Sequence, residues 1–155
     1  MAINYHAVVA APMARVGIMT TPEGVSGIDF LSLDTSLLAP RTRHAQVAVE
    51  QLQHYFYDDP SRPFCLALAV SGTPFQQRVW RALVQLPVGV TVSYGHLAQQ
   101  LKTGAQAVGN ACGANPIPII VPCHRVVGKK GIHGFCGATQ GWYPQIKQWL
   151  LHHES

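Results

Sequence analysis

The chain has 155 residues, of which 48% are hydrophobic and 12% are charged. This length can bury one good core or two small cores that share an interface, and the low charged fraction argues against a disordered chain. No run of about 18 apolar residues predicts a membrane-spanning helix, and the N-terminus lacks the features of a signal peptide. We therefore expect a cytoplasmic protein that has no membrane partner.

The charge is unevenly distributed along the chain. Residues 1–70 carry four Lys and Arg against six Asp and Glu, a balance of −2. Residues 71–155 carry seven against one, a balance of +6. A basic C-terminal half suits a polyanion such as nucleic acid, although incidental surface charge would give the same count.

The four cysteines form no C-x-x-C pair and no spacing that is usual for a zinc site. We therefore expect no metal and, in a reducing compartment, no disulfide. Cys65 and Cys112 are expected to be small, buried apolar residues.

The first 70 residues are expected to form a scaffold domain with no catalytic group. Apolar residues spaced as on a helix predict a helix over 44–57, and another strand could follow at 66–70. Three earlier apolar runs are expected to form a small antiparallel sheet: 2–11, 13–20 and 25–31.

A linker at 71–72 is expected to lead into a second domain, residues 71–155. Its first helix has a clear start, because Thr73 can cap it, Pro74 suits the first turn and Gln76 completes a capping box. Trp80 on this helix is interpreted as a core residue. The expected buried stripe is Phe75, Val79, Ala82, Leu83 and Leu86.

Two further helices follow, one capped by Ser93 and ending at Leu101, the other running from about Ala105 to Gly113. Their short connection at 102–104 contains a glycine, which is typical of a helix-turn-helix. The second helix is rich in alanine and glycine. Small residues serve tight packing in a core, or let a backbone come close to a groove, and the sequence alone leaves both interpretations open.

The stretch 115–127 reads Asn-Pro-Ile-Pro-Ile-Ile-Val-Pro-Cys-His-Arg-Val-Val. The apolar run before Pro122 predicts a buried segment that ends at Cys123. His124 and Arg125 provide a positive field there, which favours the nucleophilic thiolate. A last helix is expected from about Tyr143, with Ile146, Trp149 and Leu150 on one face.

Motifs from Gly72-Thr73-Pro74-Phe75-Gln76 to Trp149-Leu150-Leu151-His152-His153-Glu154 occur in the order seen in one family. In these motifs and in Pro122-Cys123-His124-Arg125 the chain resembles the O6-alkylguanine-DNA alkyltransferases, or methylated-DNA–protein-cysteine methyltransferases. The resemblance implies an α/β (α+β) fold: a small antiparallel sheet with a helix, then a mostly helical, winged-helix-like domain with the helix-turn-helix. It also implies a monomer that needs no cofactor and acts on double-stranded DNA.

In this family an alkyl group moves irreversibly from O6-alkylguanine, or O4-alkylthymine, to a cysteine after the base is flipped out of the duplex. The resemblance assigns the catalytic roles to Cys123, His124, Glu154 and Asn115. The glutamate orients the histidine, which reaches the sulfur through a water, and the asparagine holds the active-site turn. A frayed terminal charge is the alternative interpretation of Glu154.

The resemblance also assigns residues to the substrate and to DNA. The recognition helix of the family enters the minor groove, which would explain its small residues. The flipped base would lie against Tyr94, Val126, Phe135 and Cys136. The DNA contacts would involve Gly95, Ala105, Gln106, Ala107, Gly109, Arg125 and Lys129. For Arg125, anchoring of the local structure is the alternative to a contact with phosphate.

Three features depart from the family pattern. Gln106 stands where an arginine usually fills the gap left by the flipped base, Phe135-Cys136 replaces Tyr-Ser, and the segment 138–143 is longer than usual. A non-enzymatic module that binds alkylated DNA is the alternative function, but such proteins lack the cysteine. A Cys-His hydrolase on the same scaffold is a third possibility, without separate support in the sequence.

Overall fold

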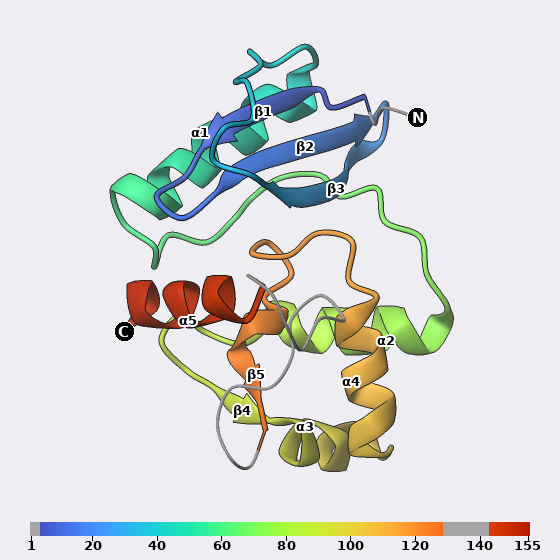
Figure 1. Ribbon diagram of the computed structural model, residues 1–155. Helices are drawn as coiled ribbons and strands as arrows, with labels where there is room; N and C mark the ends of the chain where they lie inside the picture. The colour runs from blue at the N-terminus through green and yellow to red at the C-terminus, as the bar shows by residue number, and fades with distance from the viewer. Residues whose placement is uncertain (1–3, 129–142) are drawn as a thin grey trace. The chain divides into compact units, whose positions relative to one another are not determined.

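Figure 1 shows a computed structural model of the protein, which describes residues 4–128 and 143–155. The chain forms two compact units, residues 1–70 and 71–155. Within the described ranges, none of the helices is long and apolar enough to cross a membrane.

The first unit is an antiparallel sheet with one helix packed on it (Figure 1). Thr42 caps the helix by accepting a hydrogen bond from the Ala45 N–H. The helix buries Leu52 and Tyr55, and the sheet buries Val16 and Ile18. These elements confirm the predicted sheet and helix: β1 (Ala7–Ala10), β2 (Arg15–Thr21), β3 (Gly24–Leu31) and α1 (Arg43–Tyr57).

Two predictions for this unit are wrong. The segment 66–70 is not a strand, because it forms only one isolated bridge, between Leu68 and Val25 of β3. The hydrogen bonds of this bridge join Val25 to Ala67 and Ala69. Cys65 is exposed and not buried. Its backbone N–H and carbonyl are both bound by the Gln51 side chain, at 2.8 and 2.7 Å, and this contact holds the segment at the surface of α1.

The second unit is mostly helical, as predicted. The capping box at Thr73 and Gln76 is present, and Ser93 accepts a hydrogen bond from the His96 N–H. Two two-residue strands, which are too short to show alternation in the sequence, pair in parallel. The elements are α2 (Pro74–Val84), β4 (Val92–Ser93), α3 (Tyr94–Leu101), α4 (Ala105–Gly113), η1 (Cys123–Arg125), β5 (Val126–Val127) and α5 (Tyr143–Glu154).

Helices α3 and α4 form the predicted helix-turn-helix. Lys102 turns the chain between them in the left-handed conformation, with φ of 57°. Trp80 is a core residue, as expected, and its indole N–H donates to the Ala111 carbonyl at 2.8 Å, so it fastens α2 to α4. The buried stripe of α2 is narrower than predicted, because Phe75, Ala82 and Leu86 are only half-buried.

Candidate active site

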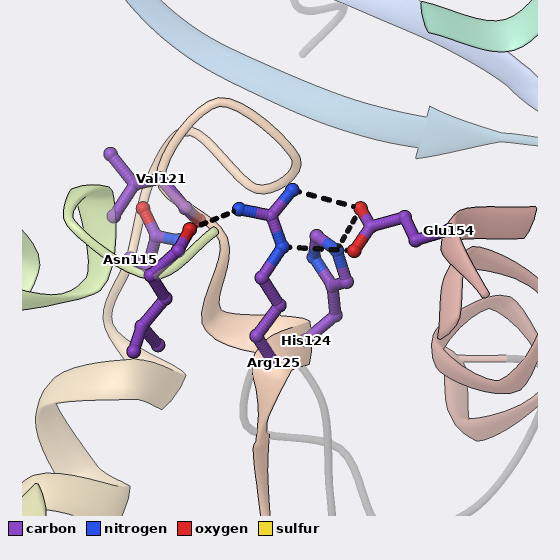
Figure 2. A network of polar contacts seen from close by, with 6 residues as sticks. Asn115, Val121, His124, Arg125 and Glu154 are labelled. Carbon is purple, nitrogen blue, oxygen red and sulfur yellow. Dashed lines mark hydrogen bonds and ion pairs between the residues drawn. The ribbon is translucent and has the colours of Figure 1, made fainter. Parts of the chain in front are cut away.

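Asn115 holds together the loop that leads to Cys123. Its side-chain amide donates to the Val121 carbonyl at 2.7 Å (Figure 2). The amide oxygen accepts from the Ile117 N–H at 3.0 Å. Within this buried loop, Ile119 has φ of 76°, a left-handed conformation that β-branched residues avoid. Such a conformation persists only where the surroundings over-determine it, and the two Asn115 bonds provide part of that constraint.

The loop ends in the 3-10 turn η1, which places Cys123, His124 and Arg125 in succession. Cys123 is 3% exposed and His124 is completely buried. The Val126 N–H donates to the Cys123 carbonyl and closes the turn. Strand β5 then pairs with β4, and this pairing brings the turn close to the start of α3, where Tyr94 lies.

Glu154 binds both side chains that follow the cysteine (Figure 2). One carboxylate oxygen lies 2.6 Å from His124 Nε2 and 3.0 Å from an Arg125 terminal nitrogen. The other accepts from Arg125 Nε at 2.9 Å. Glu154 is 7% exposed and forms the last residue of α5, so it is an ordered buried group and not a frayed terminal charge.

The network defines the protonation state of His124. The Arg125 fork keeps Glu154 ionised, and an ionised carboxylate only accepts hydrogen bonds, so His124 Nε2 carries the hydrogen. Burial lowers the pKa of His124, although the Glu154 contact opposes this shift. The ring is therefore neutral near pH 7, with a lone pair on Nδ1. This buried atom has no hydrogen-bond partner among the described residues. It can act as a base.

The structure bears on two further residues next to the cysteine. Arg125 is 7% exposed, and its third nitrogen donates to the Leu86 carbonyl at 2.7 Å, so its guanidinium anchors the local structure, which is one of the two roles expected for it. Val126 has its N–H committed to the turn, and its carbonyl accepts from Lys147 Nζ at 2.7 Å. Only the second lone pair of that carbonyl is left for a base.

Tyr94 lies beside the site at the start of α3. A Cβ added at Gly109 of α4 would meet the Tyr94 ring at 4.0 Å, so the ring covers this part of the recognition helix. Burial raises the pKa of Tyr94 above its usual range, and nearby Cys112 and Cys123 raise it further. Its phenol therefore stays protonated and can donate a hydrogen bond.

The other residues of the helix-turn-helix that are predicted to contact DNA are exposed or half-buried. Gly95, Ala105 and Gln106 are exposed, and Ala107 and Gly109 are half-buried. A Cβ added at Gly95 or at Gly104 would meet no atom of the described chain within 4 Å. Neither Gly95 nor Gly104 has a positive φ, so the backbone conformation requires no glycine at either position. Both glycines therefore leave room for an external partner.

Lys147 is a site residue that sequence analysis missed. It is completely buried in α5. Its spacing was an available signal, because Lys147, Leu150 and Glu154 are three and four residues apart and share one helix face.

Three predicted residues, Lys129, Phe135 and Cys136, lie outside the described residues. Among the residues that the structure describes, no group of three or more His, Cys, Asp or Glu could hold a metal ion.

The fold and the site define a class: α+β proteins in which a helix-turn-helix lies next to a cysteine followed by a buried histidine–glutamate pair. Residues 74–155 match the family model described as the 6-O-methylguanine DNA methyltransferase DNA-binding domain. That match covers more than half of the chain. The chain belongs to the methylated-DNA–protein-cysteine methyltransferase family.

Individual relatives agree with this assignment. The methylated-DNA–protein-cysteine methyltransferase of Shigella flexneri is 45% identical over 108 residues, or 68% of this chain, but the match spans only 60% of the relative. The constitutive enzyme of Bacillus subtilis is 34% identical, with 98% of this chain and 96% of the relative covered. The crystal structure of Mycobacterium tuberculosis OGT in complex with DNA superposes with a TM-score of 0.77. Its sequence is 36% identical to this one, and the match covers 95% of this chain and 90% of the OGT chain.

Proposed function

We propose that this protein repairs DNA by moving an alkyl group from O6 of guanine to Cys123, in a single turnover. The observation that carries the proposal is the buried contact of 2.6 Å between His124 and Glu154, directly after a shielded cysteine. This contact makes His124 a neutral base of defined orientation next to a thiol. A thiolate is the strongest soft nucleophile that a protein side chain offers.

The proposed reaction has two parts. The Cys123 proton passes to His124 Nδ1, through one water as the family resemblance implies, and the imidazolium is stabilised by Glu154. The thiolate sulfur then forms a bond to the alkyl carbon as the carbon–O6 bond breaks. The electron pair stays on the guanine, which takes up one proton in place of the proton that Cys123 released, so that His124 ends neutral. The thioether product has no easy leaving step, so each molecule reacts once.

Tyr94 has the properties of the group that receives the flipped base. Its phenol stays protonated near pH 7, and it lies close to both Cys112 and Cys123. A base must leave the stack to reach a sulfur that is 3% exposed, because a stacked base hides O6 from an enclosed thiol. We propose that Tyr94 donates a hydrogen bond to the extruded guanine and holds it against the sulfur.

The duplex would dock on the outside of α3 and α4. The open surface at Gly95 and Gly104 and the +6 balance of residues 71–155 support this site. We expect the affinity for DNA to fall as salt rises, with a log–log slope of about −0.9 for each phosphate contact, because bound cations are released. Fluorescence anisotropy over a salt series measures this slope. An affinity that does not change with salt would contradict docking on the phosphate backbone.

Gln106 is exposed near the start of α4, where relatives usually carry the arginine that fills the gap in the stack. Glutamine is shorter and uncharged, so it offsets less of the unstacking cost. Gln106→Arg should raise the transfer rate on duplex DNA roughly tenfold if it recovers about 1.4 kcal/mol. Single-turnover kinetics on an O6-methylguanine duplex measure this gain.

Two controls separate base flipping from other effects of Gln106→Arg. A free O6-alkylguanine base needs no flipping, so its transfer rate should be unchanged. Gln148→Arg adds the same charge at an exposed position of α5, outside the proposed docking surface, and should leave the duplex rate near wild type. An equal gain from both variants would show that added charge alone accelerates the reaction, and would contradict the gap-filling role.

Intact-mass spectrometry after incubation with O6-methylguanine DNA tests the proposed function. One added methyl group per chain, on the Cys123 peptide, is expected. Unchanged mass together with tight binding would favour a module that only binds the lesion, and repeated turnover without added mass would favour a hydrolase.

We also propose that the protein acts as a monomer in the cytoplasm, where thiols stay reduced.

A further inference from the structure

Lys102 turns the chain between α3 and α4 in a conformation that usually belongs to glycine (Figure 1). Its φ of 57° and ψ of 50° lie in the left-handed region, where Cβ comes too close to a backbone carbonyl oxygen. The Thr103 N–H donates to the Ala98 carbonyl at 2.9 Å, and the Lys102 N–H also points back into α3. This is the Schellman ending of a helix, in which glycine is the usual residue at the left-handed position.

Arg78 of α2 holds this turn in place. Its guanidinium donates to the carbonyl of Leu101, the residue directly before Lys102, and lies 5.9 Å from the centroid of the Phe75 ring. A residue other than glycine stays left-handed only where its surroundings over-determine the conformation. The Arg78 bond and the backbone bonds of the turn provide that constraint, so the position from which the Lys102 side chain starts is fixed.

Lys102 is also the source of positive charge on the helix-turn-helix. It is the only Lys or Arg in residues 94–113, and its side chain is exposed. Two other cations of this unit, Arg125 and Lys147, are buried. The one acidic side chain of the unit, Glu154, is already bound to Arg125. The charge of Lys102 is therefore available for an anion outside the fold.

The surface around Lys102 is open. Gly104, two residues later, is exposed, and a Cβ added there would meet no atom of the described chain within 4 Å. Helix α4 begins at the next residue, Ala105. Glycine at position 102 would relieve the backbone strain and remove only an exposed side chain. A lysine thus stands where the fold alone favours glycine, which indicates that its ammonium serves a partner.

We propose that Lys102 binds a backbone phosphate of duplex DNA, and that the left-handed turn held by Arg78 places its ammonium beside α4 for this contact. The inference rests on the proposed docking of the duplex on α3 and α4. A lysine ammonium is a compact point charge, and a contact to phosphate fixes register without reading the sequence. Lys102 would therefore position the recognition helix on damaged and undamaged DNA alike.

The test is the affinity of the full chain for labelled duplex DNA without a lesion, measured by fluorescence anisotropy over a salt series. Lys102→Asn removes the charge and supplies a residue that tolerates the left-handed conformation. Lys102→Gly removes both the charge and the strain, whereas Lys102→Arg keeps the charge. Arg81→Gln removes an exposed positive charge from α2 and serves as the control.

We expect Lys102→Asn and Lys102→Gly to make the log–log salt slope shallower by about 0.9, the share of one phosphate contact. Such a slope corresponds to a roughly eightfold loss of affinity at about 0.1 M salt relative to about 1 M salt. Lys102→Arg and the control should remain near wild type. Lys102→Gly should also raise the midpoint of thermal unfolding by about 2–4 °C, because glycine relieves the strain.

Wild-type affinity and salt slope in Lys102→Asn would overturn the proposal. An equal loss of affinity in Lys102→Arg would also overturn it, because that variant keeps the positive charge.

Methyl transfer from DNA by the wild type, followed by mass, separates this inference from the proposed function. A shallower slope in Lys102→Asn, together with a wild type that binds DNA but transfers no methyl group, would support Lys102 and contradict the repair function. Normal transfer by the wild type with an unchanged slope in Lys102→Asn would support the repair function and contradict Lys102.

Discussion

Cys123→Ala is expected to abolish methyl transfer, with a loss of at least about a thousandfold, because the covalent nucleophile is removed and the nearby Cys112 thiol stays protonated, since burial raises its pKa to about 12. The variant should remain folded, since alanine is smaller and apolar and Cys123 packs at 3% exposure. Mass spectrometry of the protein after incubation with O6-methylguanine DNA measures the loss directly.

Cys65→Ala is the matched control for this prediction. Cys65 is exposed in the first unit and has no part in the proposed site. Its replacement should leave one methyl group per chain and a normal rate. Transfer by Cys123→Ala at the wild-type rate, with the added mass on another cysteine, would refute the assignment of the nucleophile.

Glu154→Gln should reduce both stability and rate. The carboxylate accepts from two nitrogens of Arg125 and from His124. A glutamine side chain keeps the shape but directs an NH2 group at one of these donors and leaves the arginine charge buried without its counter-ion. Breaking a buried ion pair in this way costs about 3 kcal/mol or more in the free energy of unfolding.

The transfer rate of Glu154→Gln should fall by about a hundredfold, the lower end of what a positioned base contributes. Urea unfolding and single-turnover transfer at a temperature where the variant is folded separate the two effects. Glu50→Gln, at an exposed position of α1, is the control and should change neither quantity. Wild-type stability and rate in Glu154→Gln would show that the network in Figure 2 is dispensable.

Local signals in the sequence were sufficient for most of the helices. The capping box at Thr73, the cap at Ser93 and the short connection at 102–104 each depend on groups within a few residues of one another. Helices α2, α3 and α4 were therefore predicted from neighbouring residues alone. The same holds for the strands of the first unit, whose turns and apolar runs are contiguous.

The site was predictable as far as its motif extends. Cys123, His124 and Arg125 are adjacent, so their electrostatic relation follows from the sequence. Spacing alone could not decide whether Glu154 is a frayed end or a buried partner, because it lies 30 residues from His124. Spacing also left open whether Arg125 anchors local structure or contacts phosphate, since its partners are Glu154 and the Leu86 carbonyl, 29 and 39 residues away.

Tertiary structure alone decided which polar groups are buried. Lys147 resembles a surface lysine in the sequence, yet it is enclosed with a carbonyl of β5 and the ring of Tyr94. Cys65 resembles a core residue, yet it is exposed where Gln51 binds its backbone. Caps and turns depend on neighbours along the chain, whereas burial and charge pairing depend on which distant segments meet when the chain folds.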